Sequence, residues 1–327
     1  MALQIGSITL PHNAVLAPMS GVTDKPFRQI IRACGGGLVV SEMVASHAVL
    51  SEVKDEMRKL RVTAGEESPL SIQLAGWDPQ IMAEAARIAE QLGADFIDIN
   101  MGCPAKKVTG RLSGSALMRD LPLAGAICKA VKEAVRVPVT LKMRLGWEPH
   151  LLNAPELAHI AECEGIEMLA VHGRFRSQMY KGHADWEAVH QVREAVKLPL
   201  LVNGDITTLD DVDKALASSG ADGVMIGRGV QGRPWFMAQA AAQAEGRAIP
   251  DDPSLAEKHQ LMHLHLDKML AFYGTQALRL ARKHIAWYAD GLPGSAALRQ
   301  IANNTADAEA VFAAVDAFFT AQYEAAA

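Results

Sequence analysis

Short apolar runs alternate with amphipathic helical patterns through residues 14–226 of the chain. Eight runs read as buried strands: Ala14–Pro18, Leu38–Met43, Leu70–Leu74, Asp95–Asn100, Val137–Met143, Glu167–His172, Leu198–Asn203 and Asp222–Ile226. Apolar residues at helical spacing between them predict helices over Asp78–Leu92, Leu121–Ala134, Ala154–Cys163, Trp186–Ala195 and Leu209–Ser218. Eightfold strand–helix alternation is typical of a parallel (β/α)8 barrel, an α/β fold of the TIM-barrel type.

Helix-start residues support this interpretation. Asp78-Pro79 precedes one predicted helix, and Thr207 or Thr208 precedes another with Asp210-Asp211 in its first turn. The competing fold is a doubly wound open sheet. That fold usually carries a glycine-rich fingerprint after its first strand, and Ala17–Gly21 does not have one.

The pattern changes after Pro234-Trp235. Residues Glu245–Pro253 form a polar, proline-containing segment, and the chain from Ser254 onward shows helical patterns with no further strand signal. The sequence therefore predicts two domains: the barrel over residues 1–244, and a small all-helical C-terminal domain over residues 250–327.

Composition narrows the class of protein. The chain has 327 residues, a net charge of −5 and half its residues apolar, which is ordinary for a soluble globular protein. It shows no signal-peptide pattern and no apolar run of the ~20 residues that a membrane helix needs. The four cysteines lack the close spacing of a zinc site or a disulfide framework. We expect a cytoplasmic monomer with no membrane segment and no metal.

Cys103 occupies an unusual position. It follows the predicted strand Asp95–Asn100 and lies between Gly102 and Pro104, which end that strand. The thiol is therefore expected in a loop, beside Lys106 and Lys107, rather than in packed core. Such a setting is typical of a chemically active cysteine. The alternative is a small residue that simply fits a turn.

Every predicted strand ends in polar residues, and the carboxyl ends of the strands carry the active site in this fold. These ends bear Met19 and Ser20, Glu42, Gln73, Asn100 with Cys103, Lys142 with Arg144, His172 with Arg174, Asn203-Gly204-Asp205, and Gly227-Arg228. Any one of them could have a purely structural role, as a polar side chain that forms its hydrogen bonds within the barrel rim. A complete ring of them favours a functional site.

The last two strand ends suggest a cofactor. Gly204 and Gly227 expose backbone N–H groups after strands seven and eight, where many barrels bind phosphate, and Arg228 adds positive charge. With Gln73 and Lys142 near the barrel axis, the pattern suits flavin mononucleotide (FMN), whose reduced ring carries negative charge. A lysine paired with a rim carboxylate is the alternative for Lys142.

These motifs resemble the tRNA-dihydrouridine synthase family, and most closely its bacterial B-type subgroup. The similar segments cover nearly the whole chain: Ala17–Asp24, Ser41–Met43, Gln73–Gly76, Asp98–Val108, Lys142–Arg144, His172–Arg174, Asn203–Ile206, Gly227–Gly229, Gly232–Trp235 and Ala281–Tyr288. The resemblance implies FMN-dependent reduction of uridine in tRNA to 5,6-dihydrouridine.

The resemblance also implies roles for individual residues. Cys103 would be the general acid that protonates uracil C5 while a hydride passes from flavin N5 to C6. NADPH would be the electron donor, a role that rests on the resemblance alone. The implied FMN-binding residues are Pro18, Met19, Gln73, Lys142, His172, Asn203, Gly204, Asp205, Gly227 and Arg228.

Two basic segments, residues 106–120 and residues 279–299, are candidates for contact with tRNA. In the tail, residues 279–299 carry four cations against one acid, and three of the cations lie at helical i, i+3 and i+4 spacing. The expected tRNA-contacting residues are Asn100, Lys106, Lys107, Arg174, Arg279, Arg282 and Lys283. An ordinary solvated helix face is the alternative for the tail.

Two other classes of protein remain open at this point. One is an FMN barrel that reduces a free small molecule, similar to dihydroorotate dehydrogenase, which has no need of a basic helical tail. The other is an RNA-binding protein without catalytic activity, which has no need of Cys103 or of a flavin.

Overall fold

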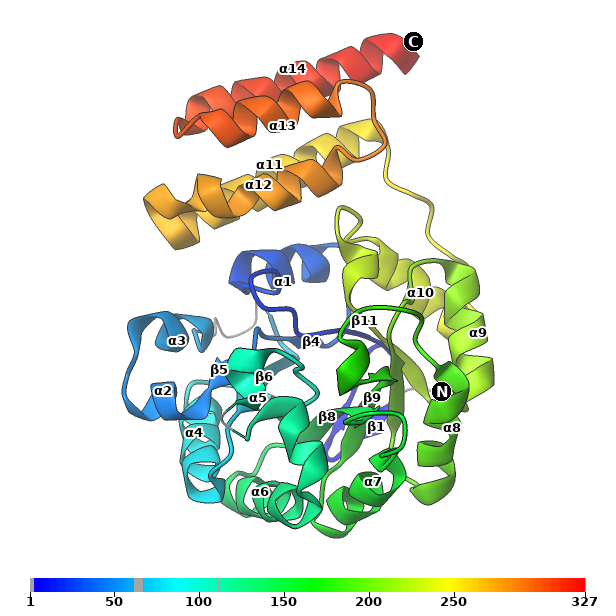
Figure 1. The fold of residues 1–327 in the computed structure, drawn as a ribbon. Coiled ribbons are helices and arrows are strands. Elements are labelled where there is room, and N and C mark those ends of the chain that lie inside the picture. The colour runs from blue at the N-terminus through cyan, green and yellow to red at the C-terminus, as the bar shows by residue number, and fades with distance from the viewer. Residues whose placement is uncertain (1–2, 62–66, 111, 327) are drawn as a thin grey trace.

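A computed structural model describes residues 3–61, 67–110 and 112–326, apart from the side chains of Lys107 and Ala326 (Figure 1). Eight parallel strands close into a barrel, because the last pairs with the first and β4 pairs with β6. The barrel strands are β3 (Ala14–Leu16), β4 (Val39–Val40), β6 (Leu70–Ala75), β7 (Phe96–Met101), β8 (Val139–Gly146), β9 (Met168–Phe175), β10 (Leu200–Asn203) and β11 (Gly223–Ile226). The predicted barrel is confirmed.

Helices surround this barrel on the outside (Figure 1). The longer ones are α1 (Lys25–Ala33), α4 (Pro79–Gln91), α6 (Leu121–Ala134), α7 (Ala154–Cys163), α8 (Trp186–Ala195), α9 (Leu209–Ser219) and α10 (Phe236–Ala244). Short helical segments lie in the loops: α2 (Ser46–Leu50), α3 (Lys54–Lys59), α5 (Lys106–Thr109), η1 (Gly114–Arg119), η2 (Arg176–Gln178) and η3 (Arg228–Val230). Asp78 and Thr208 cap α4 and α9 as predicted, each accepting backbone N–H groups of the first turn.

The second predicted strand is interrupted. The sequence predicts a strand through Leu38–Met43, but β4 ends at Val40. The Ser41 N–H still donates to the Ser71 carbonyl of β6, and residue-by-residue pairing with β6 returns in β5 (Val44–Ala45). Side-chain bonding explains the break: the Ser41 hydroxyl donates to the Glu42 carbonyl and accepts the Gln73 backbone N–H. The Glu42 carboxylate is thereby turned toward the loop after β3, where it accepts the Gly21 N–H at 2.6 Å.

A small hairpin that the sequence did not reveal closes the amino-terminal end of the barrel. It consists of β1 (Gln4–Ile5) and β2 (Ile8–Thr9), paired antiparallel. Ile5 is fully buried and belongs to an apolar cluster with Val15, Phe96 and Met168, which lie at or near the starts of barrel strands. The hairpin therefore closes this end of the barrel with apolar side chains.

The C-terminal part is all-helical, as predicted. We call α11 (Leu255–Tyr273), α12 (Ala277–Tyr288), α13 (Ser295–Asn304) and α14 (Ala308–Ala326) the helical unit; the short η4 (Gly274–Gln276) joins its first two helices. Its apolar residues form a cluster of their own, and α13 and α14 lie farthest from the barrel (Figure 1). Among the residues that the structure describes, no helix combines the length and apolar character needed to span a bilayer.

The helical unit rests on α1, near the strand-end face of the barrel. Phe27 of α1 is buried, and its ring centroid lies 5.7 Å from that of His265 and 5.4 Å from that of His284. The Tyr273 hydroxyl donates to Asp24 at 2.9 Å. The segment between barrel and helical unit is also anchored, since Asp252 accepts hydrogen bonds from side chains at the start of α10 and just before it.

Candidate active site at the strand ends

A buried hydrogen-bond network joins three neighbouring strands, β6, β7 and β8. The Gln73 amide donates to Asp98 at 2.6 Å and accepts from Asn100 at 2.6 Å, while the Thr140 hydroxyl donates to the second Asp98 oxygen at 2.6 Å. All four side chains are at most 6% exposed. Buried polar groups that satisfy one another in this way hold fixed positions. Gln73 and Asn100, both predicted site residues, are therefore rigidly placed.

The Cys103 loop is held from three directions. Asn100 Oδ1 accepts the backbone N–H groups of Gly102 and Cys103 at 3.2 and 2.9 Å. Arg144 Nε donates to the Gly102 carbonyl at 2.8 Å, and the Ser115 hydroxyl donates to the Cys103 carbonyl at 2.9 Å. The Cys103 residue itself remains partly exposed. The thiol is thus carried by a fixed backbone at the open end of the barrel.

Lys142 brings a buried ammonium group to the barrel axis. Its Nζ donates to Asn203 at 3.0 Å, and Asn203 in turn donates to the Met225 carbonyl. Burial, with help from the charge of Arg144, lowers the pKa of Lys142 from 10.5 to about 8. Burial likewise raises the pKa of Asp98 to about 6, against its hydrogen bonds and the charge of Lys142. Because burial disfavours the charged ammonium, an anionic ligand beside Lys142 would stabilise it.

The loops after β10 and β11 are tied together by one carboxylate. Asp205 accepts from Arg174 Nη2 at 2.5 Å, from the Ala184 N–H at 2.8 Å and from Arg228 Nη2 at 3.1 Å. At Gly204, where φ is +115°, a Cβ would lie 2.8 Å from the Ala184 Cβ. The predicted cradle of Asn203, Gly204, Asp205, Gly227 and Arg228 is thus assembled, with Asp205 as its organising residue.

Pro18 and Met19 adjoin this cradle. Both follow β3 and are partly exposed, and a Cβ placed on Gly227 would lie 3.5 Å from Met19 Sδ. The loop is stabilised from within by Thr23, whose hydroxyl accepts the Met19 N–H at 2.9 Å. The loops after the first and last barrel strands, β3 and β11, therefore lie side by side at the cradle.

His172 lies between the cradle and Lys142. Its pKa is well below the ordinary value because the imidazole is buried and because the cationic groups of Lys142, Arg144, Arg174 and Arg228 surround it. Since a guanidinium only donates, His172 Nε2 accepts the bond from Arg174 Nη1 at 3.1 Å. The imidazole is therefore neutral, with Nδ1–H as its remaining donor.

Arg174 does not lie where contact with RNA would need it. Its side chain is 2% exposed and donates to the Lys181 and Gly182 carbonyls as well as to Asp205. Its donors are directed inward because β9 extends three residues beyond His172, to Phe175, and the turn that follows folds over the guanidinium. This placement favours a structural role for Arg174 over the predicted contact with tRNA.

The predicted basic residues of the tail fall into two groups. Arg279 is exposed on α12, and Arg282 is half-buried. Lys283 instead reaches the barrel, where its ammonium donates to the Gly21 carbonyl, and burial lowers its pKa. On the barrel side, Lys106 is exposed at the start of α5, whereas the side chain of Lys107 lies outside the described part.

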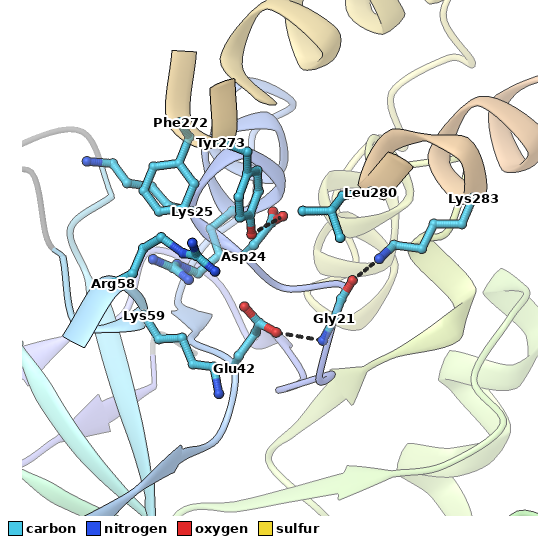
Figure 2. Close-up of a pocket in the computed structure, with 11 residues that line it drawn as sticks. Gly21, Asp24, Lys25, Glu42, Arg58, Lys59, Phe272, Tyr273, Leu280 and Lys283 are labelled. Carbon is cyan, nitrogen blue, oxygen red and sulfur yellow. Dashed lines mark hydrogen bonds between the residues drawn. The ribbon is translucent and has the colours of Figure 1, made fainter. Parts of the chain in front are cut away.

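A cavity of about 150 Å³ lies between the barrel and the helical unit (Figure 2). Its basic side chains come from α1, α3 and α12: Lys25, Arg28, Arg58, Lys59 and Lys283. Two acidic groups, Asp24 and Glu42, face them, and Phe272, Tyr273 and Leu280 close the side formed by the helical unit (Figure 2). Sequence reasoning did not identify this cavity, because its residues come from separate segments of the chain.

Sequence reasoning also left Asp98 and Arg144 without a role. A signal was present: Asp98 and Asn100 are two residues apart on β7, as are Lys142 and Arg144 on β8. Residues at that spacing on a strand face the same side. Since Asn100 and Lys142 were already expected at the barrel mouth, this spacing places Asp98 and Arg144 on the same inward side of their strands.

Comparisons with known proteins identify the family of the chain. The family profile Dihydrouridine synthase (Dus) matches residues 15–323. A probable tRNA-dihydrouridine synthase of Rickettsia conorii is 46% identical over 323 residues, 98% of either chain. The tRNA-dihydrouridine synthase B of Pseudomonas aeruginosa is 44% identical over 319 residues, covering 97% of this chain and 96% of that protein.

Solved structures share the fold at much lower identity. The histamine dehydrogenase of Rhizobium sp. 4-9 matches 82% of this chain and 50% of its own, with a TM-score of 0.56 and 14% identity. A 2-naphthoyl-CoA reductase matches 75% of this chain and 52% of its own, with a TM-score of 0.56 and 16% identity. These likenesses extend to the fold alone. The profile and the relatives, which span nearly the whole chain, show that it belongs to the dihydrouridine synthase family.

Proposed function

We propose that this protein reduces specific uridines of tRNA to 5,6-dihydrouridine, with bound FMN as cofactor and NADPH as electron donor. Residues 1–244 are the catalytic domain in this proposal, and residues 250–327 bind tRNA. The observation that carries it is the placement of Cys103, whose loop is fixed by Asn100 and Arg144 at the open end of the barrel. Family membership and the names of the relatives support the same reaction.

The polar groups at the strand ends fit FMN. Gly204 leaves room that a side chain would fill, and Arg228 adds an exposed cation at the same loops, a donor set suited to the phosphate. Lys142 supplies a buried ammonium for the ring edge that becomes negative on reduction. The remaining proposed FMN-binding residues are Pro18, Met19, Gln73, His172, Asn203, Asp205 and Gly227.

The chemistry requires two transfers to the uracil ring. FMN, when bound, supplies the hydride that adds to C6. Cys103 delivers the proton that C5 must receive, and the partly exposed thiol is then reprotonated from solvent. Asn100 and Arg144 keep the loop that carries this thiol in one position. Overall, uridine gains a hydride and a proton while NADPH is oxidised to NADP⁺.

The substrate must be held outside the barrel, because a uridine stacked within folded RNA has to turn out of its stack before it enters. The proposed phosphate contacts are Arg279, which is exposed, Arg282 on the same helix, and Lys106 at the start of α5. The cavity beneath α12 adds basic side chains to the same region, although Arg28 is buried in an ion pair with Glu67 and Lys59 pairs with Glu56.

Replacing Cys103 tests the proposal. Cys103→Ala should retain flavin and oxidise NADPH with oxygen as acceptor, yet form little dihydrouridine in tRNA taken from cells that lack the modification. Cys163→Ser, which changes an exposed thiol on α7, is the matched control and should behave as wild type. Dihydrouridine is measured by mass spectrometry of the digested tRNA. Full turnover of tRNA by Cys103→Ala would remove the role assigned to this thiol, and purified protein without flavin that cannot be reconstituted with FMN would remove the proposed cofactor.

A further inference from the structure

Two histidines and an aspartate meet on the helical unit, away from the strand-end site. His259 and His263 are four residues apart on α11 and so project from one side of that helix, and Asp316 projects toward them from α14. α14 lies at the edge of the molecule farthest from the barrel (Figure 1). The three side chains are 21%, 30% and 54% exposed, so an ion in solution can reach them.

The nitrogen and oxygen atoms of these side chains converge on one point. His259 Nε2 lies 2.8 Å from Asp316 Oδ1, and His263 Nε2 lies 2.7 Å from the same oxygen. One ligand atom from each residue lies within 4.8 Å of the other two. In a tetrahedral site with bonds of 2.0–2.1 Å, neighbouring ligand atoms are about 3.3 Å apart. The Asp316 oxygen therefore needs to move roughly half an ångström away from each imidazole nitrogen to admit an ion.

Neighbouring aromatic residues hold both imidazoles in place. The His259 ring stacks on Phe319 of α14 with centroids 4.6 Å apart, and the His263 ring lies 4.9 Å from that of Phe312. His259 Nδ1 is 2.9 Å from the Tyr323 hydroxyl. This hydroxyl can accept a bond from Nδ1–H, which leaves Nε2 free to bind a metal. A partner on the second ring nitrogen is a regular feature of metal-binding histidines.

From this geometry we propose that His259, His263 and Asp316 bind a divalent transition-metal ion of the Zn²⁺ class, with water completing the coordination. Imidazole nitrogen combined with one carboxylate oxygen favours such ions over Mg²⁺ or Ca²⁺, which prefer oxygen ligands. In the metal-free protein the imidazole Nε2–H groups donate to Asp316. On binding, each Nε2 gives up its proton to solvent and each ring carries its proton at Nδ1, so that it coordinates the ion as neutral imidazole. The metal ion would then link α11 directly to α14.

Such a link would act on the packing of the last helix. α14 contributes Val315 and Phe319 to the apolar cluster of the helical unit, and α11 contributes Met262 and Leu266. An ion that binds only when both helices are packed stabilises the packed state by mass action. We therefore expect the metal to raise the unfolding temperature while leaving the distant strand-end site unaffected.

The test uses the full chain after treatment with a chelator. Calorimetric titration with ZnCl₂ should show one ion bound per chain at micromolar concentrations. His263→Phe keeps a ring against Phe312, and Asp316→Asn keeps the side-chain volume; each should weaken binding by at least about tenfold. His150→Ala removes an exposed barrel histidine and is the control, with wild-type affinity expected. Saturating Zn²⁺ should raise the unfolding midpoint of wild type by about 3 °C or more, and that of neither ligand variant.

Co²⁺ distinguishes this site from the cysteines. The proposed ligands should give weak visible bands without the intense near-ultraviolet absorption of a thiolate bound to Co²⁺. The proposal is overturned if stoichiometric binding is missing, if His263→Phe and Asp316→Asn bind as tightly as wild type, or if the spectrum shows thiolate ligands. In any of these cases the three residues form only a hydrogen-bonded polar patch. Circular dichroism of each variant checks that the helices remain folded.

Discussion

Replacing Lys142 with Met in flavin-free protein should reveal a stability cost at the proposed cofactor site. Burial of the ammonium lowers the pKa of Lys142 from 10.5 to about 8. At about 1.4 kcal/mol per unit, keeping the charged form buried costs about 3 kcal/mol at neutral pH. Met is similar in length and removes this cost, although Asn203 Oδ1 then loses its donor at a cost of about 1–3 kcal/mol.

The dependence on pH separates these two effects. Below pH 8 the lysine is charged in both the folded and the unfolded chain, so the full cost is present. Between pH 8 and 10.5 the folded chain lacks a proton that the unfolded chain still binds, and wild-type stability rises with pH. The Met variant lacks this gain. The free energy of unfolding of Lys142→Met minus that of wild type should therefore fall by about 2 kcal/mol from pH 7 to pH 9.5.

The assay is unfolding in urea, followed by tryptophan fluorescence, of wild type and Lys142→Met at both pH values. Lys54→Met, at an exposed position on α3, is the control and should show no change in the difference with pH. FMN affinity, measured in parallel, should fall for wild type above pH 8 and be weak for Lys142→Met at every pH. A stability difference that stays constant from pH 7 to pH 9.5 would refute the reasoning, because it would mean that burial does not disfavour the charged form of Lys142.

Two further predictions concern the Cys103 loop and the tRNA-binding surface. Asn100→Ala removes the acceptor of two backbone N–H groups and should lower stability by about 1–3 kcal/mol in urea unfolding, with faster alkylation of Cys103 by iodoacetamide; an unchanged alkylation rate would mean that the loop is held without Asn100. Replacing both Arg279 and Arg282 with Ala should weaken tRNA binding and reduce the log–log salt slope by about 1.5–2 units if each contacts one phosphate, with flavin content unchanged; an unchanged slope would place the RNA elsewhere.

The barrel could be predicted because its pattern is local. Each buried strand is an apolar run, each helix has its own spacing, and caps such as Asp78 mark where helices begin. The hairpin β1–β2 was not predicted, because strands of two residues are too short to show a periodic pattern of apolar residues. The break after Val40 escaped because it depends on what the Ser41 hydroxyl bonds to, and Ser41 suits an extended strand equally well.

The site was predictable as a ring of polar residues but not as a network. Position along a strand indicates that Gln73 and Lys142 lie at the barrel mouth, whereas their partners come from other strands. Arg174 shows the limit most clearly, because its burial is set by the turn that follows β9 and not by its own position. Lys283 depends likewise on how the helical unit rests on the loop after β3.

The contact between α1 and the helical unit has a consequence for how the chain is made. Phe27 is synthesised early, but the residues that cover it, His265 and His284, come more than 230 positions later. At about 5–20 residues per second, the ribosome needs roughly 12–50 s to supply them. The last barrel strand, β11, ends at Ile226, so in the final part of that interval the outer face of α1 stays open to water on a barrel whose strands are all made. Nascent chains stalled before α11 should therefore be the form that chaperones recognise.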